Sequence, residues 1–173
     1  FSPDGRTAYL ANHESNVLSV IDVASRAVLT TIPVGTSPHS VAVSPDGTQV
    51  VVVCFDSNDV YFIDTATDQV LGSIPVGTNP QDISYSADGQ YLYANSYSGS
   101  QSTIYKYRVL NGLKSSGTNL VLEASWSAGV RVRDMIVARL GDKDIIYING
   151  NGTLYVLDTS DTANTAQSLN ITF

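Results

Sequence analysis

Residues 2–5 read Ser-Pro-Asp-Gly, residues 44–47 repeat that tetrapeptide unchanged, and residues 86–89 repeat it as Ser-Ala-Asp-Gly. Both steps are 42 residues long, and the Val-Gly pairs at residues 34–35 and 76–77 keep the same spacing. A fixed period of about 40–45 residues is typical of β-propeller blades, whereas β-solenoid coils repeat at roughly 20–30 residues. The chain is therefore expected to be all-β: a β-propeller of four-stranded antiparallel blades with a 42-residue repeat.

The second repeat unit shows the blade most clearly, because turn residues separate four short runs of apolar and β-branched side chains. These runs are residues 40–44, 49–55, 60–64 and 69–76. The run at 49–55 is almost wholly apolar, which predicts a strand covered on both faces. The unit is thus expected to form an antiparallel meander.

We expect one partial propeller domain over residues 1–173, with blades at about residues 1–37, 38–79, 80–129 and 130–173. The chain opens in mid-repeat, so the first blade is expected to lack its innermost strand. Closed propellers hold about four to eight blades, and these four are expected to belong to a longer ring. The alternative is that a second copy of the chain completes the ring.

Composition and charge exclude several classes of protein. The chain has 173 residues, of which 43% are hydrophobic and 14% charged, as in a folded domain. A net charge of −7 without a basic stripe argues against a nucleic-acid partner, and no apolar run approaches the roughly 18 residues of a membrane span. The single cysteine, Cys54, excludes an internal disulfide and is expected to be a buried, inert thiol. Glycosylation-type sequons at Asn151 and Asn170 favour an extracytoplasmic protein, at the cell surface, in a periplasm or secreted.

Three segments also carry a family resemblance. Residues 2–12 (SPDGRTAYLAN), 16–22 (NVLSVID) and 31–35 (TIPVG) resemble the YVTN family of β-propeller repeats, although residues 51–54 read VVVC where the signature falls in the second unit. The resemblance implies a ring of about seven blades. It also implies a surface-layer, periplasmic or other extracellular setting, and related propellers include sugar lactonases and the heavy subunits of quinoprotein dehydrogenases.

The segments that cross from one blade to the next carry the candidate site residues, since inner strands line the channel of a propeller. Aligned by the repeat, His39, Gln81 and Arg133 occupy one equivalent position, and Asp82 and Asp134 occupy the position after it. Such a ring of polar side chains at the channel mouth suits a metal, a sugar or an acidic ligand. The alternative is that these side chains only line a water-filled channel.

Other chemistry is weakly supported by the sequence. Asp4, Asp46 and Asp88 offer one carboxylate per turn, which suits capping of the turn better than the six to eight oxygens that Ca²⁺ prefers. Two histidines cannot form a His-rich metal centre by themselves, and no nucleophile elbow or phosphate loop is present. No cofactor and no catalytic residue is therefore predicted.

These observations favour a non-enzymatic, extracytoplasmic propeller that acts as a binding or surface-scaffold module, with its ligand or partner at the channel mouth. The alternative is a propeller enzyme, such as a metal-dependent lactonase or a quinoprotein dehydrogenase heavy subunit. That alternative requires carboxylates or histidines to converge at one mouth of the channel.

Overall fold

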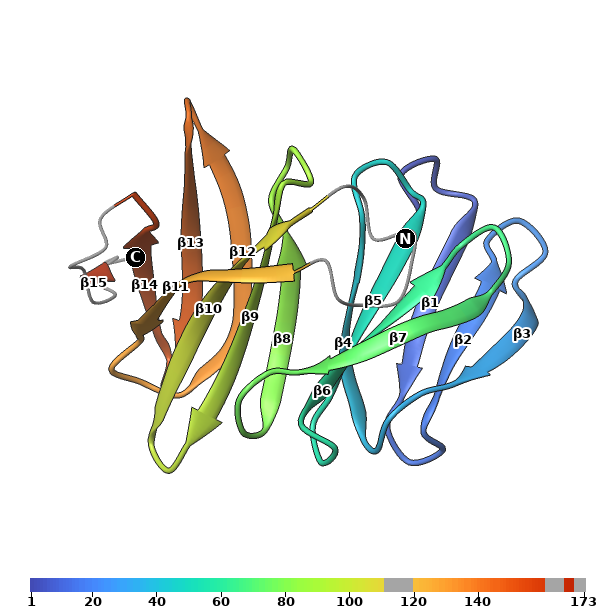
Figure 1. The fold of residues 1–173 in the computed structure, drawn as a ribbon, viewed down its shortest axis with the longest axis horizontal. Helices are drawn as coiled ribbons and strands as arrows, with labels where there is room; N and C mark the ends of the chain where they lie inside the picture. The colour runs from blue at the N-terminus through green and yellow to red at the C-terminus, as the bar shows by residue number, and fades with distance from the viewer. Residues whose placement is uncertain (111–119, 161–166, 170–173) are drawn as a thin grey trace.

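The computed structural model describes residues 1–110, 120–160 and 167–169, and these residues form four antiparallel sheets (Figure 1). The first sheet contains β1 (Thr7–Asn12), β2 (Val17–Asp22) and β3 (Ala27–Pro33). The second contains β4 (Pro38–Val43), β5 (Gln49–Cys54), β6 (Asp59–Asp64) and β7 (Gln69–Pro75). The third contains β8 (Pro80–Tyr85), β9 (Tyr91–Ser98), β10 (Gln101–Val109) and β11 (Leu120–Ser127). The fourth contains β12 (Val132–Leu140), β13 (Lys143–Gly150), β14 (Thr153–Asp158) and β15 (Gln167–Leu169).

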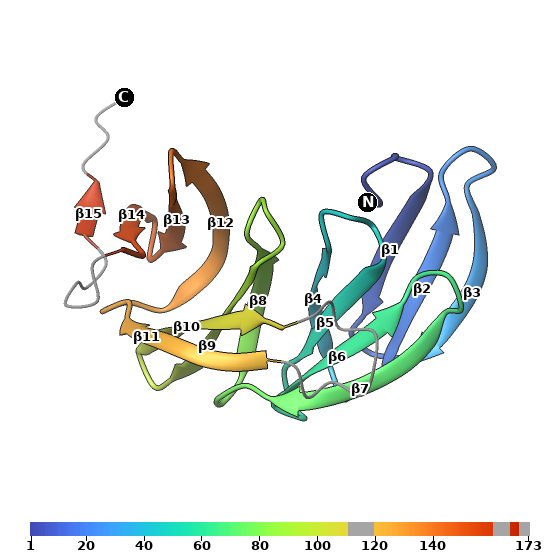
Figure 2. The same ribbon diagram turned by 45° about the horizontal axis from the view of Figure 1, so that its top comes forward.

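Each sheet is a meander whose strands lie side by side in chain order, as the repeat predicted. The sheets stand next to one another in an arc, with β4, β8 and β12 on its concave side and β3, β7 and β11 on its outer side (Figure 2). The first sheet has three strands because β1 is the repeat equivalent of β5 and not of β4. The prediction of antiparallel propeller blades is therefore confirmed, and the first sheet has three strands.

The core lies between the blades. All six residues of β5 are buried, and Val50 to Val53 have no exposed surface, because neighbouring blades cover both faces of this strand. Separate apolar clusters fill the spaces between the first and second, second and third, and third and fourth blades. Cys54 is fully buried, as expected, and burial is the main cause that raises the pKa of its thiol to about 12.

The repeated tetrapeptides form the turns at one end of the blades. In the second blade the Asp46 carboxylate accepts hydrogen bonds from the Ser44 hydroxyl at 2.6 Å and the Thr48 amide at 3.0 Å. Gly47 has φ +73°, a conformation that favours glycine. Asp4 and Asp88 cap their own turns in the same way. The capping prediction is therefore confirmed.

The two ends of the blades are named here for what they carry. The turn face holds the connections β4–β5, β8–β9 and β12–β13, at the top of Figure 1. The mouth face is the opposite end, with the connections β1–β2, β5–β6 and β9–β10 and the starts of β4, β8 and β12.

Asn151 is exposed in the β13–β14 connection, while Asn170 lies outside the described residues. No helix long and apolar enough to span a membrane occurs in the part of the chain that the structure describes.

Candidate ligand site at the channel mouth

Each inner strand starts with a β-bulge at the mouth face. In the second blade Pro38 pairs with Cys54 and Ser40 with Val53, which leaves His39 as the extra residue. The register of β12 skips Arg133 in the same way, and β8 has one extra residue between Pro80 and Ile83. A bulge redirects the side chain of the extra residue away from the regular pleat. The bulges support the repeat alignment of His39, Gln81 and Arg133.

Asn95, a fully buried residue of β9, holds the bulge of the third blade in place. Its side-chain oxygen accepts hydrogen bonds from the backbone amides of Gln81 at 3.2 Å and Asp82 at 2.7 Å. Its amide nitrogen donates to the carbonyl of Val132 in the next blade at 3.3 Å. The side chain thus fixes the backbone beneath two of the predicted site residues and ties it to the fourth blade.

Asp82 joins three blades. Its carboxylate accepts hydrogen bonds from the Ser40 hydroxyl at 2.6 Å, its neighbour Ile83's amide at 2.9 Å and the Met135 amide at 2.7 Å. Burial raises the pKa of this carboxyl above its ordinary value of 3.8, although the three hydrogen bonds act in the opposite direction. With its oxygens engaged by the protein, Asp82 holds the inner strands together.

His39 and Gln81 lie next to Asp82 at the mouth face and contact each other. The Nδ1 atom of His39 is 2.9 Å from the carbonyl oxygen of Gln81, and since a carbonyl only accepts, Nδ1 must donate. The Gln81 amide, oriented to satisfy both neighbours, donates to the carbonyl of Val132 at 2.9 Å and accepts from Arg131 at 3.3 Å. Three predicted residues, His39, Gln81 and Asp82, therefore meet at the mouth face.

Arg133 and Asp134 are exposed at the start of β12. No hydrogen bond or ion pair joins them to His39, Gln81 or Asp82 among the described residues. Their part in a ligand site stays a prediction. The cation that does reach Gln81 is Arg131, two residues earlier, which the sequence did not single out.

A row of rings crosses the mouth face from the first blade to the third. Neighbouring ring centroids are 6.5 Å apart for His13 and His39, 6.1 Å for His39 and Phe55, and 6.0 Å for Phe55 and Tyr97. The guanidinium of Arg131 ends the row, 4.0 Å from the centre of the Tyr97 ring. His13, Phe55 and Tyr97 follow one another at the 42-residue spacing of the repeat. That spacing is the sequence signal that could have found them.

Arg131, at the end of this row, has unsatisfied hydrogen-bonding capacity. It forms no ion pair with a carboxylate in the part of the chain that the structure describes. Its Nε is the buried side-chain donor without a hydrogen-bond partner among those residues. Buried polar atoms are nearly always hydrogen-bonded, so an incompletely satisfied guanidinium beside rings and an amide is suited to an anionic ligand.

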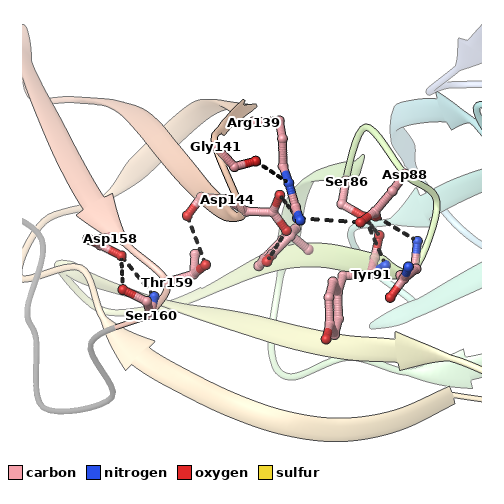
Figure 3. Close-up of polar contacts among 11 residues, drawn as sticks. Ser86, Asp88, Tyr91, Arg139, Gly141, Asp144, Asp158, Thr159 and Ser160 are labelled. Atoms are coloured by element: carbon pink, nitrogen blue, oxygen red, sulfur yellow. Dashed lines mark hydrogen bonds and ion pairs between the residues drawn. The ribbon is translucent and has the colours of Figure 1, made fainter.

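The turn face carries a second polar cluster, between the third and fourth blades (Figure 3). The buried Asp144 accepts a hydrogen bond from the Tyr93 hydroxyl at 2.8 Å and pairs with Arg139 at 3.1 Å. Arg139 also lies 3.4 Å from Asp88 of the repeated turn. Mainly through burial, the pKa of the Tyr93 hydroxyl is raised above its ordinary value. A hollow of about 270 Å³ adjoins this cluster, but Asp144 and Arg139 satisfy each other, so the cluster acts as a clasp between blades.

Comparisons with known proteins identify the fold class. No protein-family model and no curated protein matches the chain. The structure is similar to Kuenenia stuttgartiensis hydrazine synthase, at 21% identity and a TM-score of 0.75, covering 98% of this chain and 47% of that one. It is also similar to a putative 6-phosphogluconolactonase from Bacteroides uniformis, at 18% identity and a TM-score of 0.76, covering 98% and 52%. A functionally unknown protein from Desulfotomaculum acetoxidans gives 18% identity and a TM-score of 0.75, covering 95% and 54%. The chain thus spans about half the length of these proteins, and it has the β-propeller fold that they share.

Proposed function

We propose that the chain is a non-enzymatic, extracytoplasmic binding module that takes a small organic anion at the mouth face. Its binding residues are His39, Gln81, Phe55, Tyr97 and Arg131. Within this proposal, Arg131 receives the carboxylate or phosphate of the ligand, and the rings of Phe55 and Tyr97 contact its apolar or ring-shaped part. We also propose that the chain is related to YVTN-type repeats. That relationship is the reason for proposing an extracytoplasmic location.

The bonding of Arg131 is the single observation that carries the proposal. The chain is acidic, with 16 carboxylate side chains against 9 lysines and arginines. Arg139 at the turn face pairs with two carboxylates, yet Arg131 pairs with none among the described residues. A guanidinium that is held against a ring and an amide, without a carboxylate, has hydrogen-bonding capacity left for an anion.

The other residues of the site supply shape and orientation. Phe55 and Tyr97 are half-buried, and their rings lie between His39 and Arg131 in the row. Ligand sites generally combine apolar and aromatic walls with a few well-placed polar groups. His39 fills the polar role here, and the buried Gln81 orients Arg131, because its side-chain oxygen accepts from that guanidinium at 3.3 Å.

Protein-detected NMR titration with benzoate, glucuronate and 6-phosphogluconate tests the proposal, with benzamide and glucose as the uncharged counterparts. We expect at least one anion to shift the signals of Tyr97 and Gln81 while its uncharged counterpart leaves them in place. Arg131→Gln should abolish those shifts. Equal shifts from charged and uncharged compounds, or none from any of the anions, would contradict an anion site at the mouth.

Hydrolysis of a sugar lactone is the second candidate function, and it is favoured by the likeness to the putative 6-phosphogluconolactonase. Asp82 is the carboxylate that lies beside His39 and Gln81, but its two oxygens already accept three hydrogen bonds. Incubation with a δ-lactone, followed by proton release, distinguishes the two functions. Turnover by the wild type that is lost in Asp82→Asn would replace the binding proposal with the enzymatic one.

A further inference from the structure

The only two histidines of the chain lie next to each other at the mouth face. His13 belongs to the β1–β2 connection and His39 to the start of β4, so two separate blades bring them together. Their ring centroids are 6.5 Å apart, with the rings nearly perpendicular at 74°. Both side chains are exposed, which leaves them free to bind a solute from the solvent.

The hydrogen bonds of the two rings leave the same atom unprotonated in each neutral imidazole. His39 donates its Nδ1 proton to the Gln81 carbonyl. In His13, Nδ1 is 3.3 Å from a Glu14 carboxylate oxygen, which also only accepts. Both Nε2 atoms therefore carry a free lone pair. Metal-binding histidines have this arrangement, with the distal N–H held by a carbonyl or a carboxylate and the other nitrogen on the metal.

We propose that His13 and His39 bind one divalent transition-metal ion through their two Nε2 atoms. Imidazole ligands select zinc, copper or nickel over calcium or magnesium, which prefer oxygen. No group of three His, Cys, Asp or Glu side chains is placed to hold a metal among the described residues, so water or a bound anion completes the coordination. Zinc–nitrogen bonds of about 2.0–2.1 Å require the two exposed side chains to move closer together.

The metal site adjoins the proposed anion site and shares His39 with it, but each site also depends on a residue that the other lacks. His13 belongs to the metal site alone, and Arg131 belongs to the anion site alone. Loss of metal binding in His13→Ala tests the first site, and loss of anion binding in Arg131→Gln tests the second. Failure of one proposal therefore leaves the other in place.

Isothermal titration with Zn²⁺ alone tests the proposal on the wild type, His13→Ala, His39→Ala and the double variant. We expect one ion per wild-type chain. Each single variant should lose more affinity than the roughly 10- to 100-fold that removal of an outer-shell partner costs. The double variant should bind no more weakly than the single variants, because one imidazole alone does not form the site.

Asp22→Ala is the matched control, since Asp22 is an acidic residue that caps a turn at the other end of the first blade. Its zinc affinity should equal that of the wild type. Wild-type chain that binds no zinc would overturn the proposal. So would single variants that bind as tightly as the wild type, or two independent ions of which each variant loses one.

Discussion

The turn face and the mouth face differ in the residue types at equivalent positions of the repeat. At the turn face the same residue recurs in Asp4, Asp46 and Asp88, and each carboxylate bonds to its own turn. At the mouth face the equivalent residues differ in chemistry, as His39 and Gln81 do. The repeated side chains have their hydrogen bonds satisfied locally and stabilise the blade. Some side chains that differ between blades, such as Asp82, are also engaged by the protein, and others, such as His39, are the ones that we propose contact a ligand.

Two arginines of the fourth blade show the same contrast. Arg139 at the turn face lies between the carboxylates of Asp144 and Asp88 (Figure 3). Arg131 at the mouth face contacts the Tyr97 ring and the Gln81 amide. The Arg139 guanidinium joins two blades, and we propose that the Arg131 guanidinium binds an anion. Substitutions at the two faces should therefore separate stability from binding.

The largest effect on stability is expected from Asp144→Ala, which breaks the clasp of the turn face. It removes the carboxylate to which the buried Tyr93 hydroxyl donates and leaves Arg139 with one carboxylate instead of two. An unsatisfied buried polar group costs about 1–3 kcal/mol, and urea unfolding should show a loss of that size. Asp142→Ala, exposed in the β12–β13 connection two residues earlier, is the control and should stay within about 0.5 kcal/mol of the wild type. Equal losses in both variants would mean that the clasp adds no stability.

Gly47→Val should give the next largest loss. Gly47 has φ +73°, where an L-residue is strained by roughly 1–2 kcal/mol, and an added Cβ would lie 3.2 Å from Pro3. Thermal unfolding should show a clear fall in Tm. Gly47→Asn is the matched comparison, because asparagine tolerates this conformation better than a β-branched residue does. A Gly47→Val chain as stable as Gly47→Asn would contradict the strain.

Arg131→Gln should change stability much less, although we expect it to abolish anion binding. The guanidinium–ring contact contributes about 0.5–1 kcal/mol at a partly exposed site, and the substitution removes a donor that was not fully bonded. Urea unfolding should place the variant within about 1 kcal/mol of the wild type. A loss as large as that of Asp144→Ala would show that Arg131 is structural, and the contrast between the faces would fail.

The smallest effect is expected for Asp82, whose substitution should change how the free energy of unfolding depends on pH. Burial raises the pKa of this carboxyl in the folded chain above 3.8, so the folded state holds the proton more tightly than the unfolded state. Unfolding free energy therefore gains a contribution as the pH falls from neutral through the raised pKa, and this contribution is absent at higher pH. Asp82→Asn should lack that gain. Urea unfolding of both chains between neutral pH and about 4 measures it. A constant difference between the two chains would contradict the raised pKa.

Much of the blade architecture could be predicted from the sequence, because it depends on a local pattern that repeats. The strand at residues 49–55 and the turn caps each follow from spacing and residue type within one unit. The clasp could not be predicted, since Tyr93 and Asp144 are 51 residues apart and their contact needs the blades to be stacked.

The candidate site could be predicted only in part, for a similar reason. His39, Gln81 and Asp82 could be predicted to lie together because the repeat aligns them, although Asp82 is engaged by the protein. Arg131 was missed because it precedes the aligned position and reaches the site only through the crossing segment between blades. His13, Phe55 and Tyr97 keep the repeat spacing but differ in residue type, so they have no common motif.

The most direct test compares anion binding by Arg131→Gln and Arg139→Gln, two identical substitutions on opposite faces of one blade. Isothermal or NMR titration should use whichever of benzoate, glucuronate and 6-phosphogluconate binds the wild type. We predict that Arg131→Gln loses binding while Arg139→Gln keeps the affinity of the wild type with reduced stability. Binding that survives Arg131→Gln, or that disappears in Arg139→Gln while the chain stays folded, would contradict a ligand site at the mouth face.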